Sequence, residues 1–363
     1  MHKIVLKCRT ISPMFMYGSD KTPELRSSEF KGMIRYWWRL LQLESDHKEL
    51  RKKEAEIFGG TQEKEGKSKV RIKVYPQPKE FGENLKKDYK LDWSFNRQKG
   101  KHAGIEYLLY STILREKKEK TYIKPDFEFY IEITSNDSNA FLKATNALWT
   151  AIYLGGFGTR SRRGAGSIEI KEVKSTTSLS LEVDFQIPQV NSHKEIKEYL
   201  EKNIKKIYNK DNKNLRELKY PSLYNAKILI LEPKNQWIDA LNEIGINYLN
   251  YRIQNKNKIF EMGIFGMPII HNGPTMKMRI VPYEQNKHRI SERMASPLII
   301  SLIRSNNKVY PIMVKLSVPQ IIAGKEVKYK YEKWQNQGMK SINDSIINQF
   351  LESINLPKEE ITL

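Results

Sequence analysis

A glycine- and arginine-rich segment separates two stretches of different periodicity, and this order limits the possible folds more than any other feature of the chain. Apolar residues recur at helical spacing over 139–154, whereas 167–173 alternates apolar and polar residues as a strand does. Nucleotide-binding glycine loops run from a strand into a helix, whose N-terminal dipole favours phosphate. Here the order is reversed, so arginines would have to supply the charge for any bound anion.

Residues 155–166 contain five glycines and three arginines. One interpretation is a tight irregular connection that needs glycine for positive φ, but such a turn does not require arginines. The other interpretation is a polyanion-binding loop, in which glycines allow close backbone approach and arginines contact phosphates. We expect the arginines to be exposed and to add little to stability. The candidate contacts are Gly156, Gly158, Arg160, Arg162, Arg163, Gly164 and Gly166.

The composition favours an anionic partner. The chain has 363 residues, enough for two domains, and its 63 Lys+Arg against 42 Asp+Glu give a formal charge of +21. Cys8 is the only cysteine, which excludes a disulfide within the chain. No apolar run approaches the ~20 residues of a membrane span, and residues 1–7 alternate as a strand rather than a signal peptide. We expect a cytoplasmic protein with no membrane partner.

The order of predicted elements in the first half is strand, helix, strand, strand, helix, strand, which is that of a ferredoxin-like (RRM-like) α+β domain. Both helices would cover one face of an antiparallel sheet and leave the other face free to bind. A helical extension over 44–57 and a Lys-rich insertion over 79–125 interrupt this order. The predicted elements are strand 3–11, helix 28–42, strand 70–75, strand 127–133, helix 139–154 and strand 167–173.

The second half repeats this order less clearly, so we predict two similar domains. The first covers 1–175, a connector with a short helical pattern covers 176–222, and the second covers 223–363. The residues 305–308 form a plausible hairpin turn between the last two strands. The predicted elements are strand 226–232, helix 235–251, strands near 277–282, 297–304 and 310–318, and a final helix 340–354 that closes the chain.

The predicted helix 28–42 has two faces. Its apolar stripe includes Trp37, for which we expect core packing. Lys31, Arg35 and Arg39 recur every four residues, with Arg26 just upstream, and no acidic residue follows at i+4 until Glu44. This basic ridge is either a solvated helix face or an anion-binding surface, and the sequence leaves both open.

The histidines do not predict catalysis. Six occur, none with a partner at metal-ligand spacing, so we expect no metal and no other cofactor. His102 lies in a basic segment and is the best candidate for activating a 2′-hydroxyl in metal-free RNA cleavage. We expect a binding protein rather than an enzyme. Arg293, just before a predicted strand, has no assigned role.

Several short motifs together resemble the RAMP superfamily of CRISPR proteins, most closely the first RAMP subunit of the Cmr (type III-B) effector complex. No motif is specific alone, but their order and spacing are. The motifs are SPMF at 12–15, ELRxS at 24–28, KGxIRxWWR at 31–39, FGTRSRRGxGS at 157–167, FGxP at 265–268 and RxASP at 293–297.

This resemblance implies two ferredoxin-like domains and a non-catalytic role in antiviral defence, with binding near the 3′ region of a guide RNA and capture of target RNA. It implies single-stranded RNA and the other subunits of the Cmr complex as partners, and the loop 155–166 as the expected RNA contact. The superfamily also includes metal-independent endoribonucleases that process guide RNA, which is the alternative function. A DNA-binding role is a third possibility, because arginine and lysine do not distinguish RNA from DNA.

Overall fold

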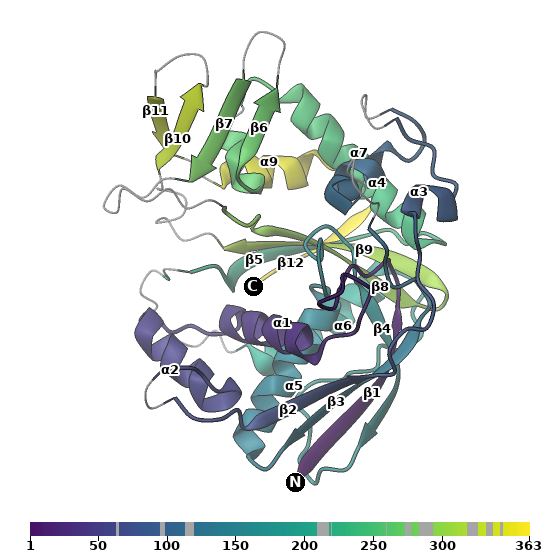
Figure 1. Ribbon diagram of the computed structural model, residues 1–363, viewed down its shortest axis with the longest axis vertical. Helices are drawn as coiled ribbons and strands as arrows, with labels where there is room; N and C mark the ends of the chain where they lie inside the picture. Colours follow the sequence, from purple (N-terminus) through teal and green to yellow (C-terminus); the bar gives the residue numbers. More distant parts are fainter. Residues whose placement is uncertain are drawn as a thin grey trace.

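The computed structural model describes most of the chain and shows a stack of alternating sheets and helices (Figure 1). The described residues are 1–62, 65–94, 99–112, 120–208, 218, 220–258, 260–272, 277–282, 293–317, 326–331, 337–341 and 344–363. Parts of the predicted insertion and connector therefore lie outside the described residues, as does His288.

The first sheet has the strand order β2-β3-β1-β4, with every pair antiparallel. Alternation of apolar residues builds it: along β1, Ile4, Leu6 and Cys8 are buried. Two helices, α1 (Ser27–Leu40) and α5 (Ser138–Tyr153), cover its inner face. Its strands are β1 (His2–Thr10), β2 (Val70–Tyr75), β3 (Glu128–Ser135) and β4 (Ile168–Ser175).

A second sheet repeats this arrangement with the order β12-β5-β9-β8 and the helices α7 (Trp237–Gln254) and α9 (Ser345–Ser353). The predicted fold class of two ferredoxin-like α+β domains is therefore confirmed. Asn306 and Asn307 form the tight turn of the β8–β9 hairpin with positive φ, where the sequence predicts a turn. The strands are β5 (Ser222–Leu231), β8 (Leu298–Ser305), β9 (Lys308–Ser317) and β12 (Lys358–Thr362).

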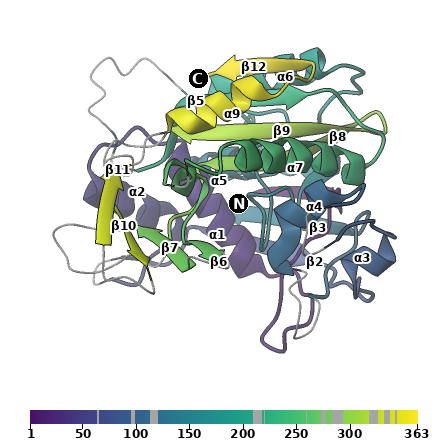
Figure 2. The same cartoon turned by 90° about the horizontal axis from the view of Figure 1, so that it is seen from above.

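The prediction that a helix closes the chain is wrong. The terminal strand β12 follows α9 and pairs with β5. The strand predicted near 277–282 belongs to a third sheet, of order β11-β10-β7-β6, inserted into the second repeat. Figures 1 and 2 show this sheet at one end of the molecule. Its strands are β6 (Ile269–Asn272), β7 (Lys277–Pro282), β10 (Glu326–Tyr331) and β11 (Gln337–Ser341).

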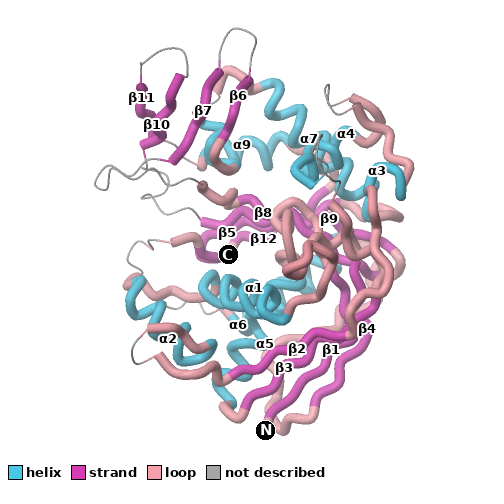
Figure 3. Tube along the Cα trace, in the orientation of Figure 1, coloured by secondary structure: helices cyan, strands magenta, loops and turns pink. Residues whose placement is uncertain are grey.

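The two halves share a core. The helices α1, α5 and α6 (His193–Ile207) lie between the first and second sheets (Figure 3). Along β5, Ile228 and Ile230 point into this middle layer, whereas Leu229 and Leu231 join the cluster under α7 and α9. The second sheet therefore has no free face of the kind we expected for a binding sheet, because the helices of the first half cover it. Of these two sheets, the first keeps an outer face, on which Lys3, Lys7 and Arg9 of β1 are half-buried.

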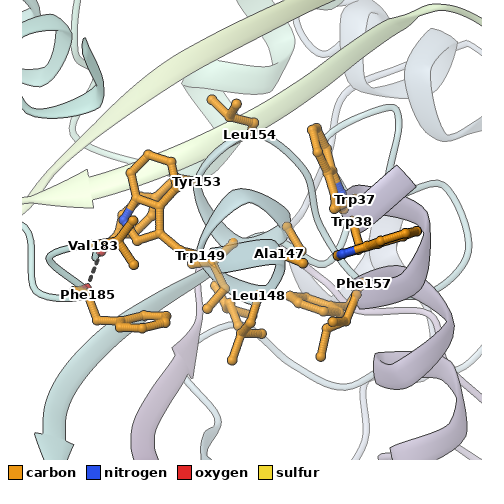
Figure 4. Close-up of a cluster of buried hydrophobic side chains, with 14 of the residues drawn as sticks. Trp37, Trp38, Ala147, Leu148, Trp149, Tyr153, Leu154, Phe157, Val183 and Phe185 are labelled. Carbon is orange, nitrogen blue, oxygen red and sulfur yellow. Dashed lines mark hydrogen bonds between the residues drawn. The ribbon is translucent and has the colours of Figure 1, made fainter. Parts of the chain in front are cut away.

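The middle layer is rich in large aromatic side chains (Figure 4). Trp37 and Trp38 from α1 and Trp149 from α5 are fully buried, as expected for Trp37. Phe157, the third residue of the glycine-rich loop, stacks on Phe30 with ring centroids 4.4 Å apart. The loop is thus anchored in the core at its start.

The first half has additional helices, of which α4 packs on the second half. The predicted helical extension is α2 (His47–Phe58), beside α1. The insertion contributes α3 (Leu85–Asp88), α4 (Ala103–Leu109) and a short 3-10 helix at Tyr110–Thr112. The helix α4 packs on α7 so closely that a Cβ at Gly104 would lie 2.1 Å from the Asn242 carbonyl oxygen. Glycine is required there by contact between two backbones.

Candidate functional site

The glycine-rich loop connects α5 to β4 and folds back on the segment that follows β1. Gly158 and Gly164 have φ of +84° and +85°, which glycine adopts without strain. The Thr159 amide donates to the Phe15 carbonyl at 2.7 Å, and the Ser12 hydroxyl donates to the Gly164 carbonyl at 2.6 Å. The glycines therefore have a structural reason to be present, which is the tight-connection interpretation.

The same loop joins the two large sheets. The Ile300 amide of β8 donates to the Arg162 carbonyl at 3.1 Å, and the Ser301 hydroxyl donates to the Gly155 carbonyl at 2.5 Å. Because β8 is the edge strand of the second sheet, the loop completes hydrogen bonds that this edge would otherwise leave open. The position of the loop is fixed by both halves of the chain.

The three loop arginines are half-buried rather than exposed as we expected, and each contacts protein groups. Arg163 donates to the Phe265 carbonyl at 2.8 Å and lies over the Tyr248 ring, 4.9 Å from its centroid. Arg160 donates to the Ser111 hydroxyl and lies 4.7 Å from the Tyr110 ring centroid. Burial lowers the pKa of Arg160.

Arg162 connects the loop to α1. Its Nη1 donates to the Ser296 carbonyl at 2.5 Å, and its guanidinium lies 4.9 Å from the centroid of the Tyr36 ring. Burial raises the pKa of Tyr36, while the nearby charges of Arg162 and Arg39 act in the opposite direction. Arg162 and Arg39 therefore approach the same ring from different segments of the chain.

The basic ridge of α1 has an acidic partner on the neighbouring helix α2. Glu54 of α2 is buried and accepts from Arg35 Nε at 2.6 Å and from Arg39 Nη1 at 2.8 Å. These two arginines therefore have an acidic partner on a neighbouring helix, although no acidic residue follows them at i+4 on their own helix. Their side chains nevertheless remain 34% and 39% exposed, and two guanidinium groups share one carboxylate. The pair keeps a net positive charge at the surface.

The other two ridge residues lie at the start of α1. Arg26 is exposed; its Nη1 donates to the Tyr17 carbonyl at 3.4 Å and lies 3.9 Å from a Glu29 carboxylate oxygen. Lys31 is half-buried, and burial followed by the charge of Arg35 lowers its pKa. The ridge is therefore a graded surface, in which Arg26 is the most accessible cation and Arg35 and Arg39 are held in fixed positions.

A pocket of about 220 Å³ lies where Tyr36 of α1, Arg162 of the glycine-rich loop and the segment 293–297 meet. In the sequence these motifs are separate and Arg293 has no assigned role, but the structure brings them together. No spacing along the chain could have predicted this, because Tyr36, Arg162 and Arg293 lie more than a hundred residues apart. The pocket is lined by Tyr36, Arg162, Pro221, Ile264, Arg293, Met294, Ala295, Ser296 and Pro297.

The histidine considered for catalysis has a structural contact. The Asp92 amide donates to Nδ1 of His102 at 2.8 Å, just before α4 begins. Within the described residues, no group of three or more His, Cys, Asp or Glu side chains has the arrangement of a metal site. None of the helices in that part of the chain is long and apolar enough to cross a membrane.

The comparisons with known proteins agree with this architecture. Residues 7–169 match the family model of the RAMP superfamily. The chain is 28% identical over 301 residues to CRISPR system Cmr subunit Cmr1-1 of Pyrococcus furiosus, covering 81% of this chain and 80% of that protein. It is 29% identical over 188 residues to Cmr subunit Cmr1-2 of the same organism, covering 48% of this chain and 98% of that protein. The chain is therefore similar to the RAMP superfamily over residues 7–169 and to these Cmr subunits.

Solved structures show the same fold at low sequence identity. The crystal structure of apo Cmr1 from Pyrococcus furiosus has a TM-score of 0.63 and 20% identity, with 99% of this chain and 98% of that chain covered. A cryo-EM structure of the type III-B Cmr-beta bound to cognate target RNA contains a chain with a TM-score of 0.60 and 16% identity, with 97% and 98% covered. The fold therefore extends over the whole chain, beyond the residues that the family model matches.

Proposed function

We propose that this chain is a non-catalytic RNA-binding subunit of a cytoplasmic type III-B CRISPR (Cmr) ribonucleoprotein complex. In this role it contacts the 3′ region of the guide RNA, the target RNA, or both, in antiviral defence. Its partners are single-stranded RNA and the other Cmr subunits. The similarity to Cmr1-1 and Cmr1-2, and to a chain of a complex bound to target RNA, supports this assignment.

The observation that carries the proposal is the convergence of guanidinium groups around Tyr36. The guanidinium group of Arg162 lies over this ring, the charge of Arg39 acts to lower the pKa of Tyr36, and Arg293 lines the same pocket from the segment before β8. Guanidinium groups fixed by neighbouring protein groups lose little freedom when they bind phosphate. The formal charge of +21 would draw RNA toward this surface.

The loop residues have different parts in this proposal. Arg162 would contact RNA directly, with the exposed Arg26 extending the path along α1. Arg160 and Arg163 are held on tyrosine rings, and their contribution would come through the donors that these contacts leave free. Gly156, Gly158, Gly164 and Gly166 would act by shaping the loop that presents Arg162.

The alternative function is metal-independent cleavage of guide RNA. His102 would be the candidate base, but its Nδ1 accepts a backbone hydrogen bond beside α4 and it belongs to none of the three motifs that meet at the pocket. A surface built from arginines without a histidine favours binding over cleavage. DNA binding is the other alternative, and a 2′-hydroxyl contact would distinguish it.

The test is incubation of the purified chain with labelled single-stranded RNA in the absence of metal, with both complex and product measured on gels. We expect a shifted complex and intact RNA. A discrete cleavage product would contradict the non-catalytic role. A DNA oligonucleotide of the same sequence, used as competitor, would contradict RNA preference if it displaced the RNA equally well.

A further inference from the structure

The pocket beside Tyr36 has mainly apolar walls. Arg162 and Arg293 belong to its lining, but the pocket is otherwise formed mainly by apolar side chains from three segments, including Ile264, Met294 and Pro297. The aromatic ring of Tyr36 forms part of the wall, and Arg162 closes over that ring. An apolar recess within a cationic surface suits a ligand with a flat apolar part and a negatively charged part.

The size of the pocket restricts the ligand. A cavity of about 150 Å³ admits a benzene molecule, so the 220 Å³ here admits one heteroaromatic ring system. The pocket opens beside Arg293, whose side chain is exposed. A phosphate attached to a ring in the pocket would therefore meet guanidinium groups at the opening. A single nucleotide combines these two parts.

The pocket shares the helix α1 with the cationic ridge. Tyr36, which lines the pocket, lies next to Arg35 in the sequence and one turn before Arg39, whose charge acts to lower the pKa of Tyr36. Arg162 is fixed by the Ser296 carbonyl at 2.5 Å and by the Tyr36 ring, which holds the wall in one geometry before any ligand arrives.

We propose that this pocket receives one unstacked base of a single-stranded RNA, while Arg293 and the α1 ridge hold the adjoining phosphates. The inference rests on the proposed function and adds to it a subsite for a base. Apolar walls contact the two faces of any base, so we expect weak sequence preference. The phosphate contacts would supply most of the salt dependence, and the pocket would supply a contribution that salt does not screen.

The experiment uses the full chain and a single-stranded oligouridylate that carries 4-thiouridine and a fluorescent label. Irradiation cross-links each thiobase to the side chains that it touches, and mass spectrometry identifies the peptide. Ala295→Phe is the pocket-filling variant, because Ala295 lines the pocket and is exposed, so a larger side chain can be accommodated without unfolding. Ser178→Phe, on an exposed residue after β4, is the matched control.

We expect cross-links in the peptides that contain Tyr36 or Met294, and their loss in Ala295→Phe but not in Ser178→Phe. The affinity of Ala295→Phe should fall between about fivefold and 150-fold, the range for loss of one base–aromatic contact. Its salt slope should equal that of the parent, because no charge has been removed. A thermal melt of both variants checks that each is folded.

Two results would overturn the inference. One of them leaves the proposed RNA-binding function intact, and the other refutes that function as well. If RNA binds with cross-links elsewhere and Ala295→Phe binds as the parent does, the base pocket is wrong while the proposed function stands. If neither the parent nor the Ser178→Phe control binds the oligouridylate, the proposed RNA-binding function fails, and the pocket with it.

Discussion

At the scale of single residues, the buried side chain of Trp37 identifies the face of α1 that packs in the core. Its side chain is 0% exposed, and a Cβ at Gly155 would lie 2.7 Å from its ring, so helix and loop are packed through this residue. Trp37→Ala should lower the free energy of unfolding by about 3–5 kcal/mol, measured by urea denaturation. Ser28→Ala, at an exposed site on the same helix, is the control. A variant as stable as the parent would contradict the assigned orientation of α1.

Arg163 illustrates how an arginine near a binding surface can serve the fold. Its hydrogen bond to the Phe265 carbonyl and its contact with Tyr248 join the loop to the second half of the chain. Arg163→Ala should destabilise the protein by about 1–3 kcal/mol, because a buried acceptor loses its donor. Thermal melts would check this, with Arg26→Ala as the exposed control. Equal melting temperatures for the parent and Arg163→Ala would show that the contact does not support the fold.

At the scale of elements, the helix pair α1–α2 holds the basic ridge through Glu54. Glu54→Gln should lower stability by about 1–3 kcal/mol, since two charge-assisted hydrogen bonds are weakened. The same change should leave RNA affinity equal or higher, because the ridge gains net positive charge. Glu56→Gln, exposed on α2, controls for the charge change alone. Weaker RNA binding by a folded Glu54→Gln variant would contradict the expected gain from net charge and would show that the fixed positions of Arg35 and Arg39 matter more.

The glycine-rich loop depends on backbone conformations that side chains rarely adopt. Gly158→Val would place a branched side chain at φ +84°, with its Cβ 2.6 Å from the Phe15 carbonyl oxygen. We expect a loss of about 2 kcal/mol or more and weaker RNA binding although every arginine is retained. Gly32→Ala is the matched control, because a Cβ there meets nothing within 4 Å in helical backbone, and it should stabilise by up to about 1 kcal/mol. Similar melting temperatures for Gly158→Val and the parent would refute the requirement for glycine at position 158.

The elements of the first half could be predicted from the sequence because their periodicity is local. The strand predicted at 70–75 is β2, and the helix predicted at 139–154 differs from α5 by one residue at each end. The sequence missed β12 because its charged residues give no apolar alternation, and it forms by pairing with β5, more than a hundred residues away. Tertiary pairing decides such strands, not local preference.

The candidate site was less predictable than the fold. Gly158 and Arg162 were predicted as contacts from the glycine- and arginine-rich segment between a helix and a strand. The partner of Arg35 and Arg39 was not predicted, because Glu54 lies on another helix. The burial of Arg163 also depends on contacts with Tyr248 and Phe265 in the second half of the chain. Charge patterns identify cations, but only the folded chain shows which of them have protein partners.

At the scale of the whole molecule, the two repeats share one core. The middle layer of α1, α5 and α6 is covered by the first sheet on one side and by the second sheet on the other (Figure 1). We continue to propose the division into 1–175, 176–222 and 223–363 as a description of the repeats. The shared core implies that this division does not separate two independent surfaces. The loop 155–166 and the ridge of α1 both lie where the repeats meet, so the fold as a whole positions the proposed RNA contacts.

The central claim is electrostatic capture of single-stranded RNA, and the salt dependence of affinity tests it most directly. Fluorescence anisotropy of a labelled RNA should give a log–log slope of roughly −3 to −4 for the parent, as expected if about 4–6 phosphates are neutralised. Arg293→Ala should reduce the magnitude of the slope by about 0.7, since one phosphate contact is lost. A flat titration for the parent, or an Arg293→Ala slope identical to that of the parent, would contradict the account.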